Sequence, residues 1–177
     1  MPRDLWRFSL DFYASPEVQA ACLELQDRHG GDVNVVLFLL WQASENAWFG
    51  PAAVAEIDAA VASWRTNTVQ KIRNIRRSLK TAAFLADGGA QESFRSKVKK
   101  LELEAEKLEQ AELERLEISP DGKSELRDAG DRSLAAYATH LGTRLPSALT
   151  GCLLDRLETL IGRPESEGPD MSSSDLP

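Results

Sequence analysis

Side chains that could do chemistry gather at one turn in the first third of the sequence. Residues 27–34 read Asp-Arg-His-Gly-Gly-Asp-Val-Asn. The chemically capable groups are an imidazole, two carboxylates and an amide, from Asp27, His29, Asp32 and Asn34. Such a set could bind a metal ion or act as an acid and a base. A structural interpretation is also open, because a histidine just before a glycine stabilises a helix end and a buried amide bonds to a neighbouring helix.

The established catalytic and metal-binding motifs are missing from the sequence. It contains no Glu-x-x-His pair for a di-iron bundle, and no His-Glu-x-x-His or Cys-x-x-Cys for zinc. It also contains no glycine-rich phosphate loop and no Gly-x-Ser-x-Gly elbow. The second histidine, His140, lies just before a glycine stop at Gly142. We therefore expect no metal and no cofactor, and we favour a protein that is not an enzyme.

A second group of charged side chains marks two consecutive predicted helices, over residues 64–85, where Ser63 is the expected N-cap, and over residues 91–117. The first is rich in arginine and the second in glutamate. A short turn at Asp87-Gly88-Gly89 favours an antiparallel hairpin, which sets Arg73 opposite Glu102 and Arg65 opposite Glu109 or Gln110.

Two interpretations of this charged seam remain open. It could be a ladder of ion pairs that only fixes the register of the hairpin. It could instead line a cleft in which an arginine is left free for an anionic ligand, since a guanidinium binds carboxylate or phosphate with two hydrogen bonds. The candidate ligand-binding residues on the hairpin are Arg65, Arg73, Arg76, Glu102 and Glu109.

The elements that position these groups all have a helical pattern, and no segment predicts a strand. The other expected helices cover residues 6–14, 16–29, 33–48, 52–62, 133–141 and 146–161. The helix over 33–48 is apolar nearly all round, which is typical of a buried central helix. The predicted fold is all-α, a compact bundle of six to eight helices with a central buried helix and an antiparallel charged helical hairpin.

The length and composition predict one domain and indicate the cellular compartment. The 177 residues suit a single helical domain over 1–161, followed by a disordered acidic tail over 162–177. The two cysteines lie in apolar helical contexts and are expected to be reduced thiols. No signal peptide is recognisable, and the longest apolar run is far too short to span a membrane. We therefore expect a cytoplasmic protein with no membrane contact.

Charge disfavours nucleic acid as a partner. The net charge is −7, and residues 101–177 carry eight basic and seventeen acidic residues, whereas residues 1–100 carry thirteen and eleven. Phosphate groups would be repelled by the overall field of such a protein.

Several segments of the sequence together carry a family resemblance. The most specific is the Asp-Arg-His-Gly-x-Asp-Val-Asn string, followed by Trp41 and the Trp64-Arg65 pair. The other segments are residues 5–13, 22–26, 101–110 and 134–142. They resemble a proteobacterial family of small helical proteins known only as a domain of unknown function, and the resemblance covers most of residues 4–160. It implies a bacterial cytoplasmic helical protein with no assigned reaction, and it supplies no catalytic residues.

Two hypotheses about function follow. The favoured one is a non-enzymatic binding or adaptor protein that engages a protein partner through the charged hairpin or through an aromatic N-terminal face, with Trp6, Phe8 and Phe12 as docking candidates. The alternative is a site for a small anionic molecule, with or without catalysis, in the Arg/Glu/His cluster. A ligand site predicts a pocket with convergent polar groups, whereas an adaptor predicts an exposed apolar patch and paired arginines.

Overall fold

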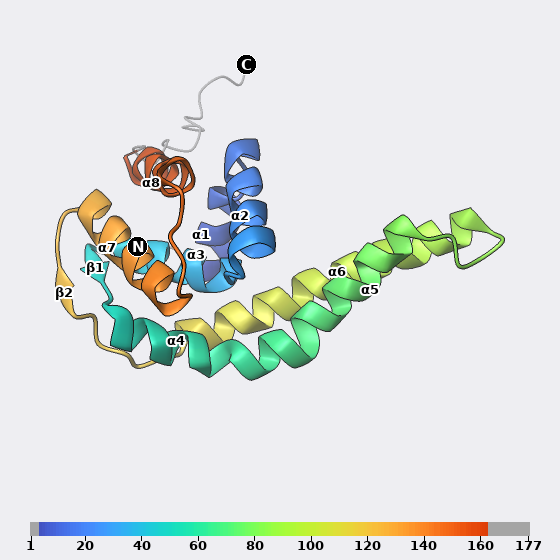
Figure 1. Cartoon of the computed structure of the whole chain (residues 1–177), viewed down its shortest axis with the longest axis horizontal. Helices are drawn as coiled ribbons and strands as arrows, with labels where there is room; N and C mark the ends of the chain where they lie inside the picture. Colours follow the sequence, from blue (N-terminus) through green and yellow to red (C-terminus); the bar gives the residue numbers. More distant parts are fainter. Residues whose placement is uncertain (1–3, 163–177) are drawn as a thin grey trace, which may run out of the picture.

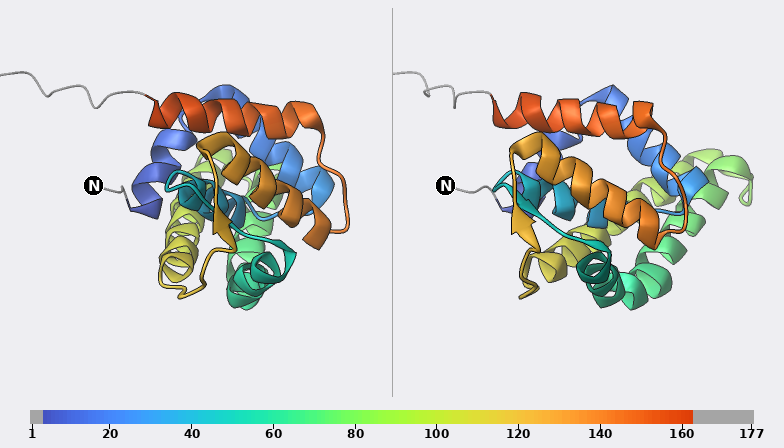
Figure 2. Two further views of the ribbon diagram at one scale, coloured as in Figure 1. Left: turned by 90° about the vertical axis from the view of Figure 1, so that its left-hand side faces the viewer. Right: turned by 60° about the vertical axis from the view of Figure 1, so that its left-hand side comes forward.

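The computed structural model describes residues 4–162 and shows an all-α fold, as the sequence predicts. A bundle of helices occupies one end of the molecule, and a long helical hairpin extends from it (Figure 1). The views in Figure 2 show α8 lying across the side of the bundle away from the hairpin. The helices are α1 (Leu5–Phe12), α2 (Pro16–His29), α3 (Val33–Ala43), α4 (Pro51–Trp64), α5 (Gln70–Thr81), α6 (Gly88–Glu114), α7 (Leu126–His140) and α8 (Ser147–Ile161).

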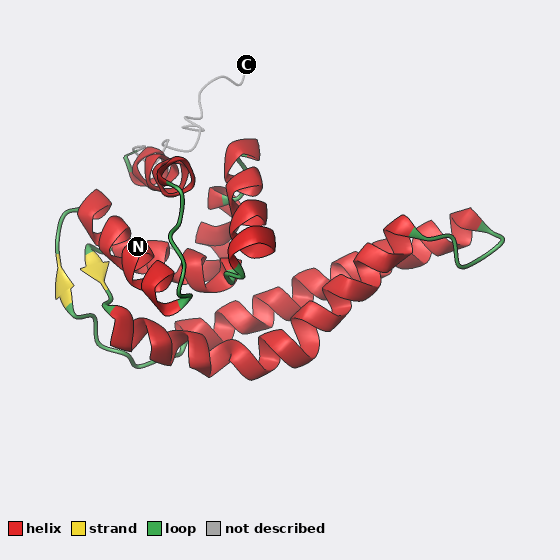
Figure 3. Ribbon diagram, in the orientation of Figure 1, coloured by secondary structure: helices red, strands yellow, loops and turns green. Residues whose placement is uncertain are grey.

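Three smaller elements complete the described chain. A π-helical turn, η1 (Arg65–Val69), joins α4 directly to α5. Two short strands, β1 (Ala47–Trp48) and β2 (Gly122–Lys123), pair antiparallel beside α7 (Figure 3).

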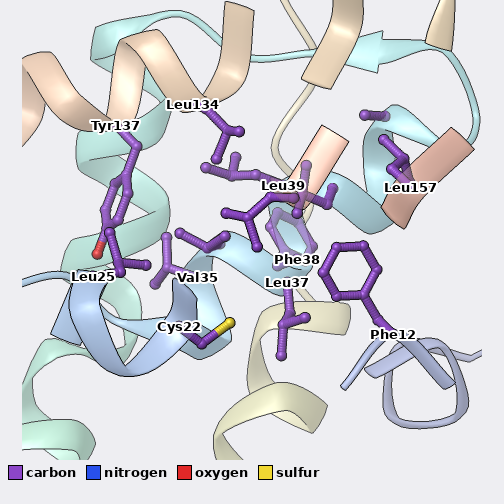
Figure 4. Packing of buried hydrophobic residues seen from close by; sticks show 14 of the residues in the cluster. Phe12, Cys22, Leu25, Val35, Leu37, Phe38, Leu39, Leu134, Tyr137 and Leu157 are labelled. Atoms are coloured by element: carbon purple, nitrogen blue, oxygen red, sulfur yellow. The ribbon is translucent and has the colours of Figure 1, made fainter. Parts of the chain in front are cut away.

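The core is built around α3, which the sequence predicts to be the central buried helix. Eight of its eleven residues are buried. Figure 4 shows side chains from neighbouring helices gathered around it, among them Phe12, Leu25, Tyr137 and Leu157. Because burying a large apolar side chain contributes about 1.5–3 kcal/mol, these contacts hold the bundle together.

Local signals set the ends of α2 and α3 at the chemically capable turn. Pro16 takes the first position of α2, and Gly30 ends that helix with φ at +67°, a left-handed conformation that favours glycine. Asp32 then caps α3, where its Oδ1 accepts a hydrogen bond from the backbone N–H of Asn34 at 2.8 Å. The turn is therefore held between two well-defined helix ends.

The third helix is shorter than predicted, and a strand follows it. Helix α3 ends at Ala43 rather than at Trp48, and Asn46 adopts φ at +64°, a left-handed conformation that a helix does not accept. The chain then pairs with β2, so the prediction of no strand is wrong. Gly122 permits this pairing, because a Cβ there would lie 2.8 Å from Nε1 of Trp48.

The predicted break between the fourth and fifth helices is also wrong. Elements α4, η1 and α5 form one uninterrupted helix from Pro51 to Thr81. Ser63 does not cap a new helix, and its carbonyl instead accepts a hydrogen bond from Nδ2 of Asn67 at 3.0 Å. No glycine or proline lies between residues 52 and 81 to interrupt the helix.

The predicted reversal between α5 and α6 is confirmed, and Gln91 fixes it. Its Oε1 accepts hydrogen bonds from the backbone N–H groups of Phe84 and Leu85 at 2.8 and 3.1 Å. Its Nε2 donates to the carbonyls of Leu79 and Ala82 at 2.9 and 2.6 Å. One buried side chain therefore satisfies four backbone groups of the turn.

The predicted acidic tail over residues 162–177 lies outside the described residues, apart from Gly162. The division into a domain over 1–161 and a tail stays a prediction. Over the range 4–162, no helix combines the length and the apolar character needed to cross a membrane.

Candidate functional site

The seam between α5 and α6 carries the predicted ion pairs between arginine and glutamate. Nε of Arg73 donates to Oε1 of Glu102 at 3.0 Å, and its Nη2 donates to Oε1 of Glu106 at 2.6 Å. Arg76 donates to both carboxylate oxygens of Glu102, from Nε and, at 3.1 Å, from Nη2. The predicted register, with Arg73 opposite Glu102, is confirmed.

The two glutamates of this seam have opposite pKa shifts. Burial raises the pKa of Glu102, but the hydrogen bonds from Arg76 and Arg73 outweigh it and hold that pKa below its ordinary value. Burial also raises the pKa of Glu106, and there the single arginine partner, Arg73, does not outweigh it. Glu102 is thus the fixed negative charge that orients both guanidinium groups.

The simple register predicts that Arg65 pairs with Glu109 or Gln110, and this prediction is wrong. Nη1 and Nη2 of Arg65 bind the two carboxylate oxygens of Asp58 at 2.8 and 3.1 Å, and Nη1 also binds Oδ2 of Asp32 at 2.9 Å. The π-helical turn begins at Arg65 and rotates it out of the register of a regular helix. Sequence reasoning missed Asp58, because this partner lies two helical turns earlier rather than across the hairpin.

Asp32 and Asn34 belong to a buried polar network that joins α3, α6 and α7. The backbone N–H of Asp32 donates to the hydroxyl of Tyr137 at 2.7 Å. Nδ2 of Asn34 donates to Oε2 of Glu109 at 3.2 Å, and its Oδ1 accepts from Nε2 of Gln110 at 2.9 Å. Asn34 therefore has the partners that a buried amide requires.

Glu109 is the most strongly perturbed carboxyl group of this network. Burial, together with a hydrogen bond to Asp32 and the charge of Asp32, raises the pKa of Glu109 to about 9. Glu109 is therefore a neutral carboxylic acid near pH 7. Its Oε1 is buried, and a cavity of about 80 Å³ adjoins the residue.

The turn over residues 27–34 splits into an inward and an outward half. Asp32 and Asn34 face the bundle, whereas Asp27 is exposed and binds Nη2 of Arg77 at 2.9 Å. His29 is half-exposed, and its imidazole makes no hydrogen bond or ion pair with residues 4–162. The predicted set of nine ligand-binding candidates therefore does not converge on one point. The structure also groups no three His, Cys, Asp or Glu side chains as metal ligands within that range.

His140, unlike His29, belongs to the polar network around Asp32 and Arg65. Its Nε2 lies 3.2 Å from Oδ2 of Asp58, so an imidazole at the end of α7 adjoins the Arg65 ion pairs. Tyr137, one turn earlier on α7, was missed by sequence reasoning because an apolar helix face predicts only packing for a tyrosine.

The aromatic N-terminal docking face is a wrong prediction. Phe8 and Phe12 are only 2% and 0% exposed, and their rings stack at 5.4 Å within the core. Trp6 alone is partly exposed, with the ammonium group of Lys107 5.7 Å from its ring centroid. Phe8 and Phe12 are spaced four residues apart and so share one face of α1, and this face packs into the bundle rather than against a partner.

A cleft of about 540 Å³ lies between α2 and the hairpin. Leu23 and Gln26 of α2, with Tyr13, line one side of it. The charged side chains on the hairpin side are Arg73, Arg76, Arg77, Lys99, Lys100, Glu102 and Glu106. The predicted Arg73, Arg76 and Glu102 thus do border a cavity.

Two lysines of this cleft escaped sequence reasoning. Neither Lys99 nor Lys100 forms an ion pair with any residue that the structure describes. Helix spacing could have found Lys99, because residues three apart share a helix face and Lys99 precedes Glu102 by three.

The opposite flank of the hairpin is apolar and exposed. Phe94, Leu101 and Leu108 recur every seven residues on α6, and their exposed fractions are 54%, 52% and 55%. Residues two apart on a helix point to nearly opposite sides, so Leu101 faces away from Lys99. Ile75 on α5 is half-exposed, and the register set by the Arg73–Glu102 pair places it near Leu101. We call Ile75, Phe94, Leu101 and Leu108 the outer row.

Comparison with known proteins identifies a family but no activity. A family model described as a protein of unknown function, DUF2390, matches residues 4–113. No curated protein and no solved structure matches the chain. The matched region begins where the sequence resemblance begins, but it ends within α6 rather than at residue 160. It includes the cleft and the parts of the network at Asp32 that lie on α3, α4 and α6. It excludes α8 and α7, which contributes Tyr137 and His140 to that network.

Proposed function

Because the chain belongs to this family, whose function is unknown, we propose from its geometry that it is a non-enzymatic helical binding or adaptor protein of the cytoplasm. The hairpin of α5 and α6 is the element that binds a protein partner. The observation that carries the proposal is an exposed apolar row on a hairpin that projects from the bundle and is strongly basic in its distal part (Figure 1). The cytoplasmic location is supported by Cys22 and Cys152, which are free thiols.

The distal part of the hairpin, residues 71–100, which we call the arm, has the opposite charge to the rest of the chain. The arm holds nine Lys and Arg and two Asp and Glu, a net charge of +7. Since the whole chain has a net charge of −7, the remainder carries −14. A surface of one sign attracts a partner of the other sign and repels one of its own. The partner surface that suits the arm is therefore acidic.

The outer row adds an apolar requirement. Three large side chains on a straight line along one helix form a seam against which a second helix packs. From Phe94 to Leu108 this line spans about 21 Å at the helical rise per residue. We therefore assign the partner as an acidic amphipathic helix of another protein, which buries its apolar face on the outer row.

Two other partners would use the arm differently. An anionic membrane would take the exposed Phe84 and Leu85 at the tip and would leave Leu108, close to the bundle, untouched. Nucleic acid would be repelled by the acidic bundle, and its binding would not need the outer row.

Site-directed photo-crosslinking in the native cell tests this assignment. A photo-reactive residue at position 101 is compared with one at Ile161, which is exposed on α8, away from the hairpin. We expect position 101 to capture a protein segment that is acidic and has apolar residues at helical spacing. Leu101→Ser with Leu108→Ser should abolish the complex with the identified partner, because both apolar contacts are lost.

A matched control removes two exposed leucine or isoleucine side chains elsewhere. Leu10→Ser with Ile161→Ser should leave the complex intact. Equal losses in the two double variants would contradict the assignment. So would capture of a segment without acidic residues, or binding of the purified protein to anionic vesicles or nucleic acid that depends on the arm.

A further inference from the structure

We propose that the cleft between α2 and the hairpin binds a small organic anion that carries at least two negative charges and an apolar group. This site lies on the other flank of the hairpin from the outer row and goes beyond the proposed partner binding. The ligand class follows from the charges, the free donor groups and the size of the cleft.

Positive charge exceeds negative charge in the cleft. Five cationic side chains line it, against the two carboxyl groups of Glu102 and Glu106. One of the five, Arg77, is paired with Asp27, an exposed residue outside the cleft lining. Lys99 and Lys100 have no acidic partner among the described residues. An anion with two or more charges would balance this excess, whereas a cation or a neutral molecule would not.

The arginines are held in place by groups that leave part of each guanidinium free. Glu102 binds Nε of Arg73 and both Nε and Nη2 of Arg76. Nη1 of each arginine makes no hydrogen bond within residues 4–162. Because Glu102 fixes the two side chains before a ligand arrives, little side-chain entropy is lost on binding. Such preorganised guanidinium groups suit phosphate and carboxylate.

Apolar side chains and a neutral donor also line the cleft. Leu23 on α2 and Leu103 on α6 are half-exposed at the cleft. Tyr13 lies there with a pKa raised to about 12, first by burial, so its hydroxyl stays protonated and can donate. A volume of about 540 Å³ is within the usual range for small-molecule sites. An organic phosphate or polycarboxylate with an apolar part meets all of these conditions.

Isothermal titration of the full chain with pyrophosphate and with citrate tests the inference, since these two probes carry the anionic groups alone. Lys99→Gln with Lys100→Gln removes the two unpaired charges without touching the ion pairs of the seam. We expect at least one probe to bind the wild type, and this double variant to weaken it by about tenfold or more. Binding of pyrophosphate but not citrate would identify phosphate as the preferred anionic group, and binding of citrate but not pyrophosphate would identify carboxylate.

The matched control removes two lysines from elsewhere on the arm. Lys71→Gln with Lys97→Gln changes the net charge equally, and neither residue lines the cleft. This control should bind the probes as the wild type does. Equal weakening in both double variants would show diffuse attraction and overturn the site, as would no binding of either probe. Leu101→Ser with Leu108→Ser should leave probe binding unchanged, so failure of the protein-partner proposal is distinguishable from failure of this one.

Discussion

Two buried carboxyl groups, Asp32 and Glu109, lie together where α3 meets α6. In the folded protein the pKa of Glu109 is raised from 4.5 to about 9 by burial and by Asp32. Between these two pH values the folded chain holds a proton that the unfolded chain has released. The stability associated with neutral Glu109 is therefore complete below pH 4.5 and is lost as the pH rises toward 9.

The substitution Glu109→Gln should remove this pH dependence. Glutamine keeps a neutral group that bonds to Asn34 and can donate to Asp32, and it does not ionise. We expect the variant to be more stable than the wild type at pH 8 by about 1–2 kcal/mol, with the difference shrinking at pH 6. Urea denaturation at both pH values measures the free energies of unfolding. Parallel pH profiles for the two proteins would contradict the prediction.

Tyr137 should contribute stability through its hydroxyl. The hydroxyl accepts the backbone N–H of Asp32 in the core, and Tyr137→Phe leaves that donor buried without a partner. We expect a loss of about 1–2 kcal/mol in the free energy of unfolding. Tyr13→Phe, at a partly exposed position, is the control and should change stability by much less. Equal effects of the two substitutions would rule out the hydrogen bond as the cause.

At the scale of elements, Gln91 closes the hairpin. Gln91→Ala should free the backbone N–H groups of Phe84 and Leu85, because both donate to its Oε1. We expect these two amides to exchange hydrogen at least about tenfold faster, while the amides of α3 stay protected. Hydrogen exchange followed by NMR measures the rates residue by residue.

Glu92→Ala is the matched control for this experiment. Glu92 is exposed and binds only Arg95 on its own helix, so its loss should not open the turn. Faster exchange at Phe84 in both variants would mean that the turn opens whenever α6 loses any polar contact at its start.

The hairpin shows how much of this protein could be predicted from its sequence. The register of Arg73 against Glu102 follows from a short turn and two amphipathic patterns, which are local properties. The helix bounds at residues 16 and 29 follow from Pro16 and Gly30 for the same reason. The uninterrupted helix through Ser63 was mispredicted, since a serine can either begin a helix or continue one, and only its neighbours in space decide.

The candidate sites were harder to predict, because they depend on which helix faces meet. Asp58, Tyr137 and His140 enter the network of Asp32 through contacts between α3, α4 and α7, which no local pattern specifies. Phe8 and Phe12 have the spacing of an apolar face, and the sequence does not state whether the bundle or a partner covers such a face. The π-helical turn at Arg65 is likewise set by the packed structure.

The whole molecule separates its charge between a basic arm and an acidic bundle. Binding of an acidic partner to the arm should therefore be fast at low ionic strength and should slow as salt screens the charges. Between about 50 and 300 mM salt we expect the association rate to fall by roughly tenfold and the dissociation rate to change little. Stopped-flow measurements with the crosslinked partner segment give both rates. A salt-independent association rate would show that the charge of the arm does not guide the encounter.

The single helix from Pro51 to Thr81 gives the molecule the mechanics of a lever. Its first half packs in the bundle against α7, and its second half carries the arm, with the π-helical turn as the fulcrum. Arg65 clamps that fulcrum to Asp58 and Asp32. A load applied at the tip by a bound partner would thus act as a torque on Arg65, a partly buried side chain far from the point of contact.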